Sequence, residues 1–197
     1  ATRNKLKKEI VTEIAATLAF SATKNNDKIG LMLFTDKIEL YIPPKKGRSH
    51  VLRIIRELLE FHPENSATDI TGALKYLSNV MKKKAIVFIL SDFIDEDYQH
   101  TLKIASNRHD VTGIRIFDRM EESIPNLGLV QMQDAESGDY ITVDTGSKSV
   151  RNSYSKYYQE RMDYFLQSFS VSGAGTINNR TDENYVKKLL GYFKRRA

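Results

Sequence analysis

The chain of 197 residues carries 30 Lys and Arg against 25 Asp and Glu, a formal net charge of +5, and it contains neither Cys nor Trp. The lack of Cys excludes disulfide scaffolds, Cys-based zinc sites and thiol catalysis. The longest apolar run, residues 85–90, is far shorter than the ~20 residues of a transmembrane helix, and no signal peptide is visible. The length predicts a single domain over 1–197, because domains commonly have about 100–200 residues.

The first half of the chain alternates between helical and extended patterns. The expected elements are helices over residues 3–25, 49–61 and 69–82 and strands over residues 29–34 and 38–42. The first strand is nearly all apolar, as in strands that are covered on both faces. The second alternates and is expected to stop at Pro43 and Pro44, which favours a hairpin with an edge strand.

The second half continues the alternation and adds a hairpin. Its expected elements are strands over residues 85–90, 111–117 and 174–179, helices over 97–108, 149–170 and the C-terminal end, and a hairpin of 129–132 with 140–143. The run 85–90 is apolar throughout, which indicates a central parallel strand. Strands that alternate with helices predict a doubly wound, mainly parallel α/β sheet with helices on both faces.

Two of the predicted helices have apolar faces that should pack on the core. The aromatic stripe of helix 149–170 is expected to be a core face rather than a platform for stacking bases. The last helix is expected to be capped by Thr181 or Asp182. The residues that it should bury are Tyr185, Val186, Leu189, Leu190 and Phe193.

Two loops carry residues with chemistry suited to a site. Thr68 and Asp69 stand at the start of a predicted helix, and Ser91 and Asp92 follow the most apolar strand. Ligands of doubly wound sheets bind beyond the carboxyl ends of the strands, and hydroxyl and carboxylate oxygens suit Mg²⁺. Each loop alone has an ordinary structural explanation, since Thr68 or Asp69 is a typical helix N-cap. Their position on one edge of the sheet is what points to a site.

Sequence motifs of other functions are absent or weak. No dinucleotide-binding, Walker A or nucleophile-elbow motif occurs, and the four His residues show no metal-binding spacing. Asp92 and Asp95 resemble a phosphotransfer pair, so a Mg²⁺-dependent hydrolase or phosphotransfer enzyme is the alternative function. A weaker alternative is binding of nucleic acid or an anionic membrane through Lys45, Lys46, Arg48 and the basic C-terminus. Solvated surface explains these basic residues more simply.

Several stretches together resemble the von Willebrand factor A-like domain of the bacterial domain-of-unknown-function-58 family. They cover nearly the whole chain: EIAATLAFSATKNNDKIGLMLFTDKIELYIPPKKGRSHVLRIIRELL, ATDITGAL, FILSDFID, RHDVTGIRIFD, IPNLGLVQMQDAESGDYITVDT and RTDENYVKKLLGYFKRR. The resemblance implies a Rossmann-like sheet, with the hairpin and helix at about 119–170 as an insertion. It also implies a metal-ion-dependent adhesion site for Mg²⁺, in which Thr68 and Asp92 are the metal ligands. The edge around Ser66, Asp69, Ser91 and Asp95 would then receive a partner.

The same resemblance implies what the chain lacks and what it does. The family's Asp-x-Ser-x-Ser metal loop and its first central strand would lie before Ala1, so we expect a fragment that binds Mg²⁺ weakly at best. The implied function is a non-enzymatic, cytoplasmic protein-interaction module. It would work with a MoxR-type AAA+ ATPase in chaperone-like or complex-assembly tasks.

Overall fold

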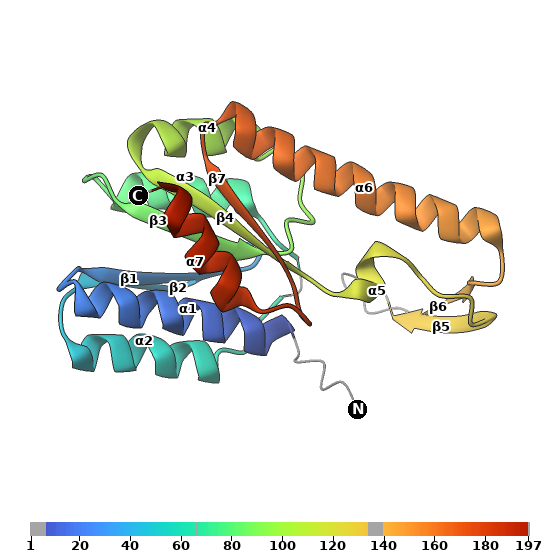
Figure 1. Ribbon diagram of the computed structural model, residues 1–197, viewed down its shortest axis with the longest axis horizontal. Helices are drawn as coiled ribbons and strands as arrows, with labels where there is room; N and C mark the ends of the chain where they lie inside the picture. Colours follow the sequence, from blue (N-terminus) through green and yellow to red (C-terminus); the bar gives the residue numbers. More distant parts are fainter. Residues whose placement is uncertain (1–6, 66, 134–139, 197) are drawn as a thin grey trace.

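The computed structural model describes residues 7–65, 67–133 and 140–196, and it shows an α/β fold (Figure 1). Its main sheet contains three parallel strands in the order β3-β4-β7. Their bounds are β3 (Ile86–Ser91), β4 (Asp110–Phe117) and β7 (Gly175–Arg180). The predicted α/β class is therefore confirmed.

The central strand of this sheet is β4, not the apolar run that forms β3. Every residue of β4 after Asp110 is buried, whereas in β3 only Ile89 is. β3 pairs with β4 alone, and no strand lies on its other edge in the described part of the chain. Apolar content therefore predicted the strand correctly but not its place in the sheet.

The strands β1 (Ile29–Phe34) and β2 (Ile38–Lys45) form a separate antiparallel sheet. The predicted hairpin is confirmed, but β2 does not stop at Pro43 and runs on to Lys45. The register jumps from Ile29↔Lys45 to Leu31↔Ile42, which leaves both prolines opposite Gly30. A bulge on an edge strand tolerates prolines because their missing N–H groups break no ladder bond.

Helices cover both faces of the main sheet. One face packs against α3 (Ile70–Val80), α4 (Gln99–Arg108) and the C-terminal part of α6 (Lys148–Val171). The other packs against α1 (Lys7–Lys24) and α7 (Tyr185–Arg196), with Ile14 of α1 contacting the cluster around Ile114 of β4. α2 (Arg48–Glu60) packs with α1 and β1. The predicted core face of α6 is confirmed by Phe165 and Phe169, both fully buried.

A two-stranded hairpin, β5 (Leu129–Gln133) with β6 (Tyr140–Asp144), projects beside the N-terminal end of α6 (Figure 1). The predicted strands are confirmed, and their expected turn at Ser137 and Gly138 lies outside the described residues. The short helix α5 (Arg119–Glu122) connects β4 toward this hairpin.

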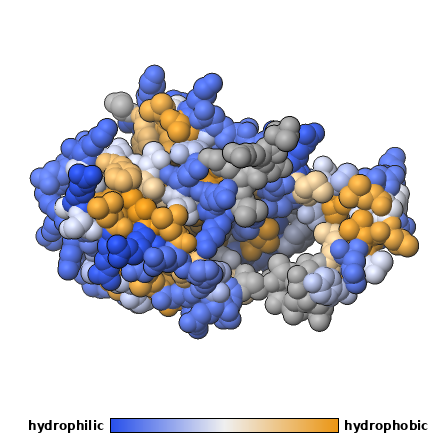
Figure 2. All heavy atoms as spheres, turned by 90° about the horizontal axis from the view of Figure 1, so that it is seen from below, coloured by the Kyte–Doolittle hydropathy of each residue, from blue (hydrophilic) through white to orange (hydrophobic). Residues whose placement is uncertain are grey.

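Apolar side chains are exposed on two parts of the surface. Figure 2, a view from the α2 side, shows them on the main part of the molecule and on the β5–β6 hairpin. The exposed large apolar residues of α1, α2, β5 and β6 are Phe20, Leu52, Leu59, Leu129, Tyr140 and Ile141. No helix within the described ranges has the length and apolar character needed to cross a membrane.

The last helix buries a narrower face than predicted. Leu189 and Tyr192 are buried, but Val186, Leu190 and Phe193 are 42%, 56% and 41% exposed. Residues one position along a helix are rotated by about 100°, so the second apolar stripe turns away from the sheet. The predicted caps are also wrong. The side chain of Asn184 accepts a hydrogen bond from the Lys187 N–H, while Thr181 and Asp182 bond to Asp118 and Arg180.

Candidate functional site

Thr68 and Asp92, which come from separate loops, line one pocket of about 230 Å³. Ser91, Lys7 of α1 and Phe34 of β1 also line it. Thr68 precedes α3 and Asp92 follows β3, so the pocket lies at the carboxyl ends of the strands. That edge is where open α/β sheets bind ligands. The structure thus brings the two predicted ligands together, while their role in binding a metal stays a prediction.

The positive charge beside Asp92 is the ammonium group of Lys7. Its Nζ lies 2.8 Å from the Asp92 carboxylate and 2.8 Å from the carboxylate of Glu121. Burial lowers the pKa of Lys7, but the charges and hydrogen bonds of Asp92 and Glu121 outweigh burial and leave that pKa above its usual 10.5. Lys7 is therefore a stable cation that joins the loop after β3 to the helix after β4.

The Asp92 loop has a constrained backbone. Phe93 adopts φ 58°, in the left-handed region that is unfavourable for side chains other than glycine. Its backbone N–H donates to Ser91 Oγ at 3.1 Å. Its ring is 1% exposed and packs 4.5 Å from the ring of Phe165 and 5.3 Å from that of Phe169, measured between centroids. These ring contacts fix the turn in which Asp92 lies.

Arg115 of β4 holds the same turn through a hydrogen bond. The sequence did not reveal this role. Arg115 is 1% exposed, and its Nε donates to the backbone oxygen of Asp92 at 2.9 Å. Its Nη1 donates to the Tyr158 hydroxyl at 3.0 Å, and the guanidinium lies 4.8 Å from the centroid of the Tyr158 ring. The one available signal in the sequence is a charged residue in the middle of the mostly apolar run 111–117, which implies a buried and specific role.

Asp69 and Asp95 both accept hydrogen bonds from backbone N–H groups in the first turn of α3. Asp69 is its N-cap and accepts from the Gly72 N–H at 2.7 Å. Asp95 accepts from the Ile70 N–H at 2.8 Å. Desolvation raises the pKa of Asp95, helped by the charges of Asp69 and Asp97 and opposed by hydrogen bonds from backbone N–H groups. These contacts fix the Thr68 loop against the Asp92 loop. Ser66, the other residue expected at this edge, lies outside the described residues.

The turn between β1 and β2 also holds the Thr68 loop, a contact that the sequence did not reveal. The Asp69 N–H donates to the Thr35 backbone oxygen at 2.8 Å. Asn65 donates to the Asp36 carboxylate at 2.8 Å, which lowers the pKa of Asp36 together with the hydrogen bond from Thr35. The separate β1–β2 sheet is thereby attached to the pocket through polar contacts.

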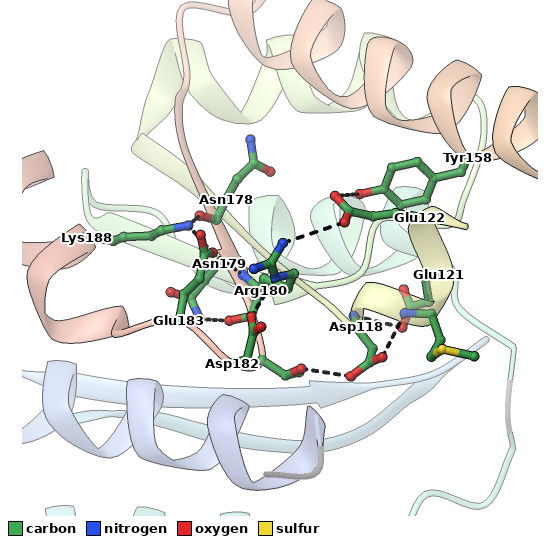
Figure 3. A network of polar contacts seen from close by, with 12 residues as sticks. Asp118, Glu121, Glu122, Tyr158, Asn178, Asn179, Arg180, Asp182, Glu183 and Lys188 are labelled. Carbon is green, nitrogen blue, oxygen red and sulfur yellow. Dashed lines mark hydrogen bonds and ion pairs between the residues drawn. The ribbon is translucent and has the colours of Figure 1, made fainter. Parts of the chain in front are cut away.

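A network of hydrogen bonds and ion pairs links the residues that follow β4 to those at the end of β7 (Figure 3). Asp118 caps α5 and accepts from the Thr181 hydroxyl at 2.9 Å. Arg180 lies 3.8 Å from the Glu122 carboxylate and also pairs with Asp182. Because Glu121 of the same α5 turn contacts Lys7, the network is continuous with the Asp92 pocket.

The described residues supply few charged ligands for a magnesium ion. In residues 7–65, 67–133 and 140–196 no group of three or more His, Cys, Asp or Glu side chains could hold a metal. The pocket offers one carboxylate, Asp92, with the hydroxyls of Thr68 and Ser91, and Lys7 already balances that carboxylate. Mg²⁺ is commonly held by one or two carboxylates with waters at its other positions, so this pocket offers only the smallest usual number of carboxylates.

The comparisons with known proteins give relatives without an assigned function. Uncharacterized proteins from Mycobacterium bovis and Mycobacterium tuberculosis are each 21% identical over 189 residues, which covers 94% of this chain and 59% of theirs. The chain thus spans 59% of the length of these relatives. An uncharacterized protein from Mycobacterium avium is 24% identical over 160 residues, which covers 79% of this chain and 93% of that protein.

One solved structure is similar. It is the crystal structure of an aerotolerance-related membrane protein from Bacteroides fragilis with multiple mutations to serines. Its TM-score is 0.47 and its sequence identity 14%, and the match covers 81% of this chain and 88% of that chain. Residues 1–163 match the family described as protein of unknown function DUF58. Since this match covers most of the chain, the protein belongs to the DUF58 family.

Proposed function

We propose that this chain is a protein-interaction module of the von Willebrand factor A type, which receives a partner at the pocket between Thr68 and Asp92. The observation that carries the proposal is the convergence of two separate loops on one pocket at the carboxyl edge of the sheet. Arg115 and the anchored ring of Phe93 hold Asp92 in a fixed position. A rigid, partly exposed carboxylate is well suited to recognising a partner, because little conformational freedom is lost on binding.

The partner proposed from the family resemblance is a MoxR-type AAA+ ATPase. The test is a pull-down of such an ATPase from the same organism with the wild-type protein and with Asp92→Ala and Thr68→Ala. Both variants are expected to reduce capture at least tenfold. Asp163→Ala is the matched control, because this residue is exposed on α6 and its carboxylate accepts a hydrogen bond from Gln159 of the same helix. Equal capture by Asp92→Ala and the wild type would contradict the proposed docking site.

Magnesium binding is a separate question that a titration answers. For residues 1–197 we expect weak binding of Mg²⁺ at best, since Lys7 already pairs with Asp92. A longer chain that also carries an Asp-x-Ser-x-Ser loop is proposed to bind it more tightly. Calorimetric titration of both chains, each with and without Asp92→Ala, distinguishes the cases. Tight binding by residues 1–197 would contradict this expectation.

The alternative enzyme function gains no support from the arrangement of Asp92 and Asp95. Both oxygens of Asp95 accept hydrogen bonds from backbone N–H groups, those of Ile70 and Glu96. Asp92 pairs with Lys7. Phosphatase assays with Mg²⁺ test this alternative directly, and turnover that is lost in Asp95→Asn would favour it.

A further inference from the structure

The outer edge of β7 is an open sheet edge with a basic border. β7 pairs with β4 on one side, and no described strand lies on the other. Lys188 Nζ donates to the backbone oxygen of Asn178, and the Arg180 N–H donates to the Glu183 carboxylate at 2.8 Å. The backbone groups of residues 178 and 180 therefore point away from β4. Because a strand alternates every two residues, those of Thr176 point the same way.

A groove runs between this edge and α7. It has a volume of about 310 Å³, and its lining includes Thr176, Asn178, Lys187, Gly191 and Arg195. At Gly191 an added Cβ would meet no atom within 4 Å, so the helix side of the groove is open. The groove thus borders the backbone groups of β7 that point away from β4, of which the Asn178 carbonyl and the Arg180 N–H are already bonded to Lys188 and Glu183.

The border of the groove is positively charged. Lys187 and Arg195 are exposed, and neither forms an ion pair with another described residue. By contrast, their neighbours Lys188 and Arg196 are paired with Glu183 and Asp110. An incoming segment would therefore meet two unpaired cations on α7 as it approached the backbone of β7.

We propose that the outer edge of β7 binds an extended acidic peptide segment of a partner protein, which adds to the sheet as a further strand. The N–H and C=O of Thr176 and the N–H of Asn178 would form the main-chain hydrogen bonds, as in other strand-addition complexes. Lys187 and Arg195 would pair with carboxylates of the peptide and give the site its preference for acidic sequences. This surface is separate from the Thr68–Asp92 pocket, so Asp92→Ala should leave it unchanged.

Binding of a fluorescein-labelled nine-residue peptide of alternating Glu and Val tests the proposal. The variant Lys187→Glu with Arg195→Glu is expected to weaken binding at least tenfold. The matched control is Lys83→Glu with Lys103→Glu, two exposed lysines outside the groove, and it should retain the wild-type affinity within twofold. An equal loss in both double variants would show that the peptide binds through the overall charge of the protein and not at this groove. That result would overturn the proposal.

The contribution of the backbone is tested separately. The same peptide with alternate amides N-methylated keeps its charge but loses half of its donors, and its affinity should fall at least tenfold. In a two-dimensional NMR spectrum the amide signals of Thr176 and Asn178 should shift when the unmodified peptide is added. Unchanged affinity of the methylated peptide, or shifts confined to other elements, would overturn the proposal. So would equally effective competition by an oligonucleotide of the same charge.

Discussion

Lys7 Nζ lies 2.8 Å from the carboxylate of Asp92, and this ion pair joins the first turn of α1 to the end of β3. The same ammonium lies 2.8 Å from Glu121, so one lysine balances two carboxylates from different parts of the chain. The two carboxylate side chains are 30% and 22% exposed, which leaves the cluster partly screened by water. Its contribution to stability is therefore expected to be real but modest.

Lys7→Gln should lower the free energy of unfolding by about 0.5–1 kcal/mol near neutral pH. Because the pKa of Lys7 is raised in the folded protein, its contribution is fully present below 10.5, the unfolded value, and is lost as the pH rises through the higher folded value. Urea denaturation of both proteins at several pH values measures the difference, which should shrink above pH 10.5. Lys24→Gln, at the other end of α1, is the control and should show no such difference. A difference that is constant with pH would contradict the assignment.

Replacing Phe93 by glycine should destabilise the protein less than replacing it by alanine. Phe93→Ala removes a buried ring, at a cost of about 3–5 kcal/mol, and keeps a side chain at φ 58°. Phe93→Gly removes the same ring but relieves the left-handed strain, which is worth about 1–2 kcal/mol. The glycine variant is therefore expected to be the more stable of the two in denaturant titrations. If alanine proves more stable, the strain ascribed to this turn is absent.

Gly113 in β4 should not tolerate a methyl group. A Cβ at this position would lie 2.5 Å from Cζ and 2.6 Å from Cε1 of Phe169, so Gly113→Ala is expected to destabilise the protein by about 1–3 kcal/mol. Phe169→Leu makes room, and the double variant should lose less stability than the sum of the single variants. Gly191→Ala is the contrast, since its Cβ meets nothing and a helix favours alanine by about 0.5–1 kcal/mol. Additive losses in the double variant would show that the two sites do not interact.

The α/β class and the positions of Thr68 and Asp92 could be predicted because they depend on local patterns. Hydrophobic periodicity predicts the strands and helices, and the carboxyl ends of parallel strands meet at one edge of the sheet. The contacts of Lys7 and Arg115 could not be predicted in this way. Lys7 reaches a carboxylate 85 positions further along the chain, and Arg115 reaches the loop of a neighbouring strand. Such partners depend on how the elements pack, which periodicity does not specify.

The same limit explains the errors in the last helix. Its apolar residues cover a wide arc, and periodicity treats all of them as core. The sheet covers only the stripe that contains Leu189 and Tyr192, so Leu190 and Phe193 stay exposed. The width of an apolar arc predicts that a helix packs, while the shape of its neighbour decides which part of the arc is buried.

His109 should make stability depend on pH in the acidic range. It is only 3% exposed, and neither ring nitrogen has a hydrogen-bond partner among the residues that the structure describes. Burial lowers the pKa of His109, and the neighbouring charge of Arg108 lowers it further. The unfolded chain therefore takes up a proton below 6.5, the usual pKa, while the folded protein does not, so stability is complete above that pH and is lost as the pH falls below it. Each unit of pKa depression corresponds to about 1.4 kcal/mol.

The measurement is the free energy of unfolding of the wild type and of His109→Phe between neutral pH and the folded pKa. The phenylalanine variant lacks the titrating ring and should lose less stability over that interval. His100→Phe is the matched control, since His100 is exposed on α4. Parallel pH profiles of His109→Phe and the wild type would show that the buried ring is already paired or solvated. A difference confined to the acidic side would instead establish His109 as a neutral, buried histidine whose protonation opposes folding.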